Sequence, residues 1–201
     1  MAKPARLDNY KKFAAFLVIA SAIGLAAAFI LTIEKIQLLK NPVTQLSCNI
    51  NPIVACGSVI QSKQAEAFGF ANPIIGLVGF GVIITIGMGM FAGAKYKRWF
   101  WLGLEAGTVF GVLFSMWLFY QSVYVIQALC PYCMVVWAVV IALFVNVTIF
   151  NLNQKFIKLP AKYDKIIKFL TTYKWWVVLI WYLIILGLIA NHFWYYWKTL
   201  F

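Results

Sequence analysis

Five long apolar stretches restrict the fold of this chain more than any other feature. Each is about as long as the roughly 20 residues that cross a lipid bilayer as a helix. Hydrophobic residues make up 64% of the chain and charged residues 11%, against roughly 25% charged residues in soluble domains. The sequence therefore predicts an all-α integral membrane protein with five spans, at residues 13–33, 73–94, 99–123, 134–150 and 175–190.

The basic residues are distributed very unequally between the two sides of these spans. Thirteen Lys and Arg lie in residues 1–12, 95–98 and 151–174, and four lie in the remaining segments. Because positive charge stays on the cytoplasmic side, the N-terminus is predicted to be cytoplasmic. The loop 34–72, the turn 124–129 and the C-terminus are predicted to be extracytoplasmic. Topology accounts for the net charge of +12, so nucleic-acid binding is not expected.

The motif Cys130-Pro131-Tyr132-Cys133 opens the fourth span. Two thiols three positions apart at the start of a helix share one face and can close a small disulfide ring. Pro131 suits the first helical turn, and the partial positive charge of a helix N-terminus stabilises a thiolate. Since thiolates carry out disulfide exchange, the motif indicates a redox-active pair.

All four cysteines are predicted on the extracytoplasmic face, where disulfides form and persist. Single cysteines in membrane helices are commonly apolar fillers, but two pairs at one face argue against that interpretation. Cys48 and Cys56 fit either a second redox pair or a structural disulfide. A structural role is weaker for Cys130 and Cys133, because a bridge within one turn constrains little chain entropy. A zinc site of four cysteines is disfavoured at an oxidising face, and no metal is expected.

This constellation resembles the vitamin K epoxide reductase family. Its elements are Cys48 and Cys56 in a long first loop, Ser62, Asn72 just before the next span, and the Cys130–Cys133 motif heading the fourth span. The resemblance implies a four-helix transmembrane bundle around a quinone pocket, to which this chain adds a fifth helix. It also implies that Cys133 faces the quinone, that Cys130 exchanges with Cys56, and that the pair Cys48–Cys56 meets a thioredoxin-fold partner.

The same resemblance implies five residues that bind the quinone, namely Asn72, Ser62, Phe68, Leu118 and Trp137. Asn72 would donate a hydrogen bond to a quinone carbonyl, although a residue before Pro73 also fits a helix cap. Ser62 would orient the substrate, although it also fits an ordinary loop serine. Trp137 stands where vertebrate members have Tyr, which leaves open the substrate preference and the sensitivity to coumarin-type inhibitors. The sequence does not decide whether vitamin K epoxide is also reduced.

The resemblance covers residues 10–150, and the five-span pattern is that of prokaryotic members. Residues 1–150 are predicted to form the catalytic bundle, and residues 151–201 a basic cytoplasmic linker with the fifth helix. Many bacterial members continue into a thioredoxin-like domain that this sequence lacks, so a separate DsbA-like partner is expected. Two alternatives are a DsbB-type disulfide generator, whose CxxC motif lies in the first outer loop, and a non-catalytic membrane protein with structural disulfides.

Overall fold

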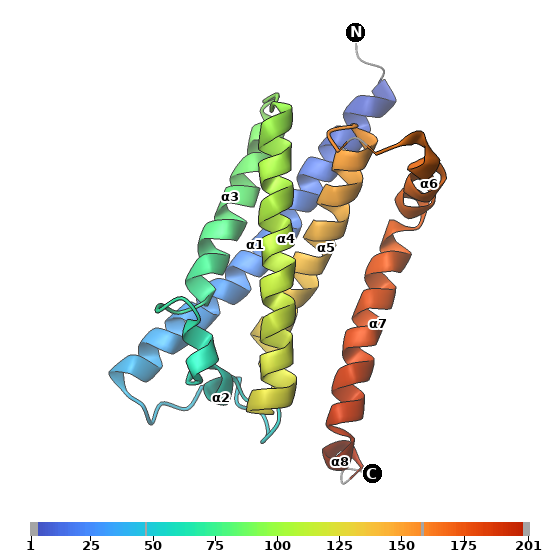
Figure 1. The fold of residues 1–201 in the computed structure, drawn as a ribbon. Coiled ribbons are helices and arrows are strands. Elements are labelled where there is room, and N and C mark those ends of the chain that lie inside the picture. Colours follow the sequence, from blue (N-terminus) through green and yellow to red (C-terminus); the bar gives the residue numbers. More distant parts are fainter. Residues whose placement is uncertain (1–3, 47, 158, 199–201) are drawn as a thin grey trace. The chain divides into compact units, whose positions relative to one another are not determined.

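The computed structural model describes residues 4–46, 48–157 and 159–198, and this part of the chain is mostly helical (Figure 1). Five helices are long and apolar enough to cross a membrane, as predicted. The longer elements are α1 (Pro4–Lys40), α3 (Pro73–Phe91), α4 (Arg98–Tyr120), α5 (Pro131–Asn153), α6 (Asp164–Thr172) and α7 (Lys174–His192). The short ones are α2 (Cys56–Ile60), η1 (Lys63–Glu66), the π-helical turn η2 (Gln121–Ile126), η3 (Ala161–Tyr163) and α8 (Trp194–Trp197).

Helix α1 continues seven residues beyond the predicted end of the first span, so the prediction that the loop begins at residue 34 was wrong at its start. The extra residues run from Glu34 to Lys40 and are nearly all strong helix formers. Leu31, Glu34 and Leu38 recur at helical spacing and are all buried. Packing along this face extends the helix past the point where apolar composition ends.

The loop and the turn that follow are partly helical as well. Between α1 and α3, α2 and η1 are two separate short helices with Gln61 and Ser62 between them. The turn expected from Tyr124 onwards is helical as far as Ile126, where α4 continues into the π-helical turn η2. It ends at Gln127, whose left-handed φ of 57° breaks the helix.

The chain divides into two compact units, and the first comprises the described part of Met1–Lys97 together with Ala128–Val139. Its largest contact joins α1 and α3. Gly87 permits the close approach, because a Cβ atom there would lie 2.7 Å from Val18 Cγ2 and 3.1 Å from the Ala14 carbonyl oxygen. Small residues commonly allow such packing between membrane helices.

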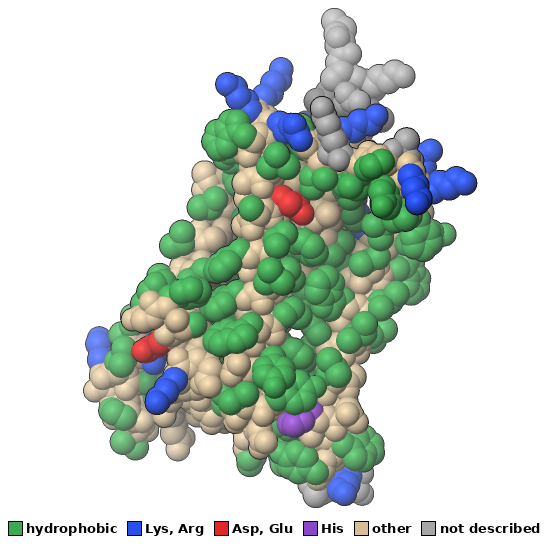
Figure 2. All heavy atoms as spheres, in the orientation of Figure 1, with side chains coloured by type: hydrophobic (Ala, Val, Ile, Leu, Met, Phe, Trp, Pro, Cys, Tyr) green, Lys and Arg blue, Asp and Glu red, His purple; other side chains and the backbone are tan. Residues whose placement is uncertain are grey.

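The second unit comprises Arg98–Gln127 and the described part of Val140–Phe201. Large apolar side chains are exposed along its helices α4 and α7 (Figure 2), including Leu113 and Leu183. Such a surface is expected of helices that face lipid. The division into units follows contacts, and the domain boundary predicted at residue 150 stays a prediction.

A polar network lies between α4 and the part of α5 in the second unit. The Glu105 carboxylate accepts hydrogen bonds from Thr148 Oγ1 at 2.6 Å and from Asn151 Nδ2 at 2.8 Å. Asn151 Nδ2 also donates to the carbonyl oxygen of Trp101 at 3.2 Å. Polar groups inside a membrane span are costly unless they are hydrogen-bonded, and this network satisfies the carboxylate within the helix pair.

Candidate dithiol–disulfide site

All four cysteines come together in one apolar cluster of the first unit. Cys48 and Cys56 form a disulfide with a Cα–Cα distance of 5.6 Å, whereas Cys130 and Cys133 are free thiols. Cys56 and Cys130 are fully buried. The surrounding apolar side chains come from α1, the loop and α2, namely Leu31, Leu38, Leu46 and Ile60. The sequence predicted that the two pairs share one side, and the fold places them in one cluster.

A short parallel backbone pairing brings the loop pair to the head of α5. The Ala55 N–H donates to the Leu129 carbonyl oxygen at 2.9 Å, and the Leu129 N–H donates to the Ile53 carbonyl oxygen at 2.7 Å. Parallel backbones paired in this way lie about 4.8 Å apart. The bridge joins Val54 to Leu129, two residues before Cys56 and one residue before Cys130. The pairing therefore brings the segment of Cys56 to the segment of Cys130, and both cysteines are buried in the same cluster.

Two asparagines hold the loop backbone in this position. Asn51 Oδ1 accepts hydrogen bonds from the N–H groups of Ile53 and Val54, at 3.0 and 2.7 Å. Asn49 Oδ1 accepts one from the Gly57 N–H at 3.0 Å. The first contacts form an Asx turn, and the last satisfies a backbone donor in the first turn of α2. The loop is therefore ordered by side chains that lie between its two cysteines.

Cys130 immediately precedes α5, and its sulfur accepts a hydrogen bond from the Cys133 backbone N–H at 3.4 Å. A hydrogen bond from the Cys133 side chain lowers the pKa of the Cys130 thiol, and backbone donors of Tyr132 and Cys133 act in the same direction. Burial and the Glu34 carboxylate oppose this effect, but the pKa stays below its ordinary value. Because a thiol with a lower pKa leaves more readily as a thiolate in disulfide exchange, Cys130 is a better leaving group than a cysteine with an ordinary pKa.

Sequence reasoning missed Glu34, which lies against the loop disulfide. Cys48 Sγ is 3.2 Å from Glu34 Oε2 and 3.5 Å from Oε1, and the glutamate is 95% buried. The signal was its spacing within α1, because Glu34 falls on the same buried face as Leu31 and Leu38. A carboxylate in an apolar stripe at helical spacing marks a buried polar group.

The three potential ligand atoms of Glu34, Cys48 and Cys56 lie within 4.8 Å of one another. Metal ions bind cysteine as thiolate. In the disulfide the two sulfurs are bonded to each other and offer no thiolate. The disulfide form of the pair therefore provides no cysteine ligand for a metal ion.

Comparison with known families supports this interpretation of the cysteines. Residues 15–148 match the model of the vitamin K epoxide reductase family, and this region contains both cysteine pairs. The chain belongs to the vitamin K epoxide reductase family. A comparison with curated individual proteins finds no match. Membership makes the chain a membrane thiol–disulfide oxidoreductase, and an all-α membrane protein with five long apolar helices is what the fold shows.

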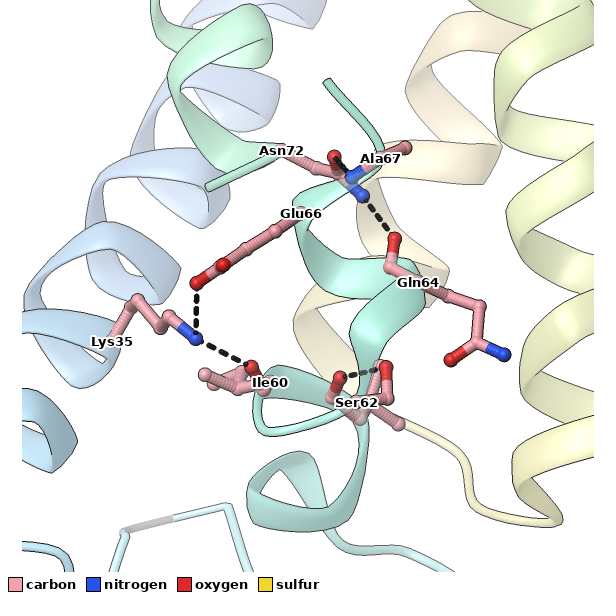
Figure 3. Close-up of polar contacts among 8 residues, drawn as sticks. Lys35, Ile60, Ser62, Gln64, Glu66, Ala67 and Asn72 are labelled. Atoms are coloured by element: carbon pink, nitrogen blue, oxygen red, sulfur yellow. Dashed lines mark hydrogen bonds and ion pairs between the residues drawn. The ribbon is translucent and has the colours of Figure 1, made fainter. Parts of the chain in front are cut away.

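Of the residues that the family resemblance assigns to quinone binding, Asn72 and Ser62 lie in the segment between α2 and α3 (Figure 3). Asn72 Nδ2 donates to the Gln64 carbonyl oxygen at 2.7 Å, and Asn72 Oδ1 accepts from the Ala67 N–H at 3.1 Å. Asn72 occupies the N-cap position of α3, as the helix-cap alternative requires, but its side chain makes no cap bond to that helix. Ser62 Oγ donates to the Val59 carbonyl oxygen at 2.7 Å.

The same segment is tied to α1 by Lys35 (Figure 3). Its ammonium lies 2.8 Å from Glu66 Oε1 and donates to the Ile60 carbonyl oxygen at 3.0 Å. The lysine side chain is 13% exposed and the glutamate side chain 46%. Lys35 therefore joins the end of α2 and the end of η1 to the helix that carries Glu34.

The apolar residues assigned to the quinone come from both units of the chain. Phe68 is 53% exposed and stacks on Phe70 with ring centroids 6.4 Å apart. Trp137 is buried one helical turn after Cys133 in the first unit, and Leu118 is half-buried on α4 in the second unit. Their contact with a quinone, like that of Ser62 and Asn72, stays a prediction for this member of the family.

Proposed function

We propose that the chain transfers two electrons from the dithiol of a thioredoxin-fold protein to a membrane quinone. The partner thereby acquires a disulfide. The observation that carries this proposal is the hydrogen bond from Ala55 to Leu129, which brings the segment of Cys56 to that of Cys130, with both cysteines buried in one cluster. Two dithiol–disulfide couples in contact can pass electrons by exchange, whereas isolated structural disulfides have no such neighbour.

The first exchange reduces the loop pair. A thiolate of the partner attacks Cys48, a partner–Cys48 disulfide forms, and Cys56 leaves as a thiolate. The second thiol of the partner then attacks the partner sulfur that is bonded to Cys48. This closes the partner's disulfide and releases Cys48, so the loop has gained two electrons and the partner has lost them.

The second exchange moves these electrons to the motif. The Cys56 thiolate attacks Cys130, the Cys130–Cys133 bond breaks, and Cys133 leaves as a thiolate. Cys48 then attacks Cys56, restores the loop disulfide and releases Cys130 as a thiolate. The hydrogen bonds that lower the pKa of Cys130 favour this release. A disulfide at Cys48–Cys56 with free thiols at Cys130 and Cys133 is the product of this exchange.

The residues near Cys133 suit an aromatic acceptor. Cys133 is half-buried at the start of α5, and Trp137, one turn further on, is buried. Residues four apart on a helix share one face, so the thiol and the indole lie on the same apolar side. A quinone, when bound, accepts two electrons and two protons and thereby allows the Cys130–Cys133 disulfide to re-form. The large potential difference between thiols and quinones favours this direction.

The proposed topology places both pairs on the extracytoplasmic side. Thirteen of the 17 Lys and Arg residues lie in the segments assigned to the cytoplasm, and the positive-inside rule orients the chain accordingly. An extracytoplasmic site is consistent with a partner that folds in an oxidising compartment.

The test uses purified full-length protein, a reduced thioredoxin-fold protein and a soluble quinone. We expect quinone absorbance to fall while the partner gains one disulfide per quinone consumed. Cys133→Ala should abolish quinone reduction yet still allow a mixed disulfide between Cys56 and Cys130. Full turnover by Cys133→Ala, or quinone reduction without oxidation of the partner, contradicts the proposal.

A further inference from the structure

A glutamate against a disulfide sulfur in an apolar cluster calls for a chemical explanation. A disulfide sulfur carries no hydrogen, so it cannot donate to the Glu34 carboxylate that lies 3.2 Å away. Burial of a carboxylate charge is costly unless the charge is neutralised. After reduction, however, a Cys48 thiol at this distance would be a donor to the same oxygen. The position of Glu34 is therefore explained by the reduced form of the loop pair, in which the Cys48 thiol has a proton to donate, and not by the disulfide form.

We propose that Glu34 is the proton carrier of the loop cysteine pair: it takes the Cys48 thiol proton when the loop disulfide closes and returns it when that disulfide opens. The inference rests on the proposed function, because it concerns the step in which the loop hands electrons to the motif. Glu34 contacts a reacting sulfur and is in this sense a catalytic residue.

Closure of the loop disulfide begins with ionisation of Cys48. The Cys48 thiol transfers its proton to the Glu34 carboxylate, and the resulting thiolate attacks Cys56 in the Cys56–Cys130 disulfide. The Cys48–Cys56 bond forms, the Cys56–Cys130 bond breaks, and Cys130 leaves with the electron pair as a thiolate. Cys48 is oxidised and Cys130 is reduced. When a partner later releases Cys48 as a thiolate, the proton returns from Glu34 to its sulfur.

Among the described contacts, Glu34 is the proton acceptor closest to Cys48. Lys35, its neighbour on α1, directs its ammonium to Glu66 of η1 and to the Ile60 carbonyl oxygen. The titratable groups packed into the cluster from the other elements are Cys48 and Cys56 of the loop and α2, and Cys130, Tyr132 and Cys133 at the head of α5. The Glu34 charge acts on Cys130 and opposes the lowering of its pKa, so transfer of a proton to Glu34 also favours release of the Cys130 thiolate.

The step can be isolated in full-length protein with Cys130→Ala and Cys133→Ala, which leaves the loop pair alone. The reduced loop is treated with oxidised glutathione, and the decay of the glutathione adduct on Cys56 is followed by acid quenching and peptide mass. This decay reports the attack of Cys48 on Cys56. A further Cys48→Ala protein, in which the adduct should persist, identifies the attacked sulfur.

With Glu34 present, the closure rate should change by less than about threefold between pH ~6 and ~8, because the carboxylate accepts the proton locally. Glu34→Gln keeps the size and polarity of the side chain but cannot take a proton. We expect it to slow closure by about tenfold or more at neutral pH, with a rate that rises about tenfold per pH unit as Cys48 ionises in solution. Glu34→Asp, which retains a carboxylate, should restore the flat pH profile.

An unchanged rate and pH profile in Glu34→Gln would overturn the inference. If that variant fails to fold, the pH profile of the protein that retains Glu34 tests the inference by itself. A closure rate that rises tenfold per pH unit through the neutral range would show that no local base operates. The assay contains neither quinone nor partner. Its failure therefore leaves the quinone assay untouched, and failure of quinone reduction leaves this result standing.

Discussion

The backbone N–H of Ala55 donates to the carbonyl oxygen of Leu129 at 2.9 Å, one residue before a cysteine in each segment. The pairing brings the segment that continues to Cys56 against the segment that continues to Cys130, whereas Cys48 contacts Glu34 on α1. Under the proposed function, Cys56 is therefore the loop cysteine that exchanges with Cys130.

The pairing predicts the yield of trapped disulfides. A protein with Cys48→Ala and Cys133→Ala retains Cys56 and Cys130, and mild oxidation should join them in nearly all molecules. The matched control, Cys56→Ala with Cys130→Ala, retains Cys48 and Cys133 and should form far less intramolecular disulfide. Peptide mass after alkylation measures both. Equal yields in the two proteins would contradict the assigned exchange partners.

Asn72 provides a prediction that separates structure from substrate binding. Asn72→Ala removes both hydrogen bonds of its side chain and should destabilise the segment between α2 and α3 by about 1–2 kcal/mol. Asn72→Asp keeps the acceptor for the Ala67 N–H but loses the donor to Gln64. Hydrogen exchange at Ala67 should therefore stay protected in the aspartate variant and become fast in the alanine variant.

The same two Asn72 variants test the predicted contact with the quinone. An amide donor to a quinone carbonyl is missing from both, so both should show a raised KM for quinone. If KM rises only in the variant that loses protection at Ala67, Asn72 acts by holding the loop. The assay is quinone reduction at saturating partner.

The pH at which Cys130 ionises should depend on Cys133. The hydrogen bond from the Cys133 side chain lowers the pKa of Cys130, so the reduced protein holds more thiolate at a given pH than an ordinary thiol would. Cys133→Ala removes this donor, and the pKa of Cys130 should rise, with thiolate formation moved to higher pH. Ultraviolet absorbance of the thiolate measures the shift in protein with Cys48→Ala and Cys56→Ala.

The control for this titration is the same protein with Cys130→Ala, whose absorbance is subtracted to remove tyrosine ionisation. The lowered pKa of Cys130 also makes the stability of the reduced protein depend on pH. A depressed folded-state pKa stabilises the reduced fold fully above the pKa that the thiol has in the unfolded chain, and this stabilisation is lost as the pH falls through the folded-state pKa. A titration that moves to lower pH in Cys133→Ala would contradict the assigned hydrogen bond.

The polar network of the second unit predicts a loss of stability. Glu105→Ala leaves the donors of Thr148 and Asn151 without their carboxylate acceptor and should cost about 1–3 kcal/mol. Glu105→Gln retains one amide oxygen as acceptor and should lie between the alanine variant and the original protein. Thermal unfolding in detergent, monitored by helical circular dichroism, ranks the three proteins. Equal midpoints would show that these hydrogen bonds contribute nothing net.

The sequence by itself determined the five membrane helices and the presence of two cysteine pairs. Span length and apolar composition are properties of consecutive residues, because a helix in lipid must satisfy its own backbone hydrogen bonds. The Cys130–Cys133 motif is equally local, since its spacing alone brings two thiols to one helical face. The extension of α1 to Lys40 was missed because it depends on packing beyond the apolar run.

The tertiary structure alone decided the contacts between segments far apart in the sequence. The pairing of Ala55 with Leu129 and the approach of Glu34 to Cys48 join residues with no common sequence pattern. Asn72 similarly binds the loop that precedes it, where the sequence allowed either a helix cap or a substrate contact. These hydrogen bonds and this burial depend on which surfaces come into contact when the helices pack. A local pattern of residues does not specify which distant segment it will contact.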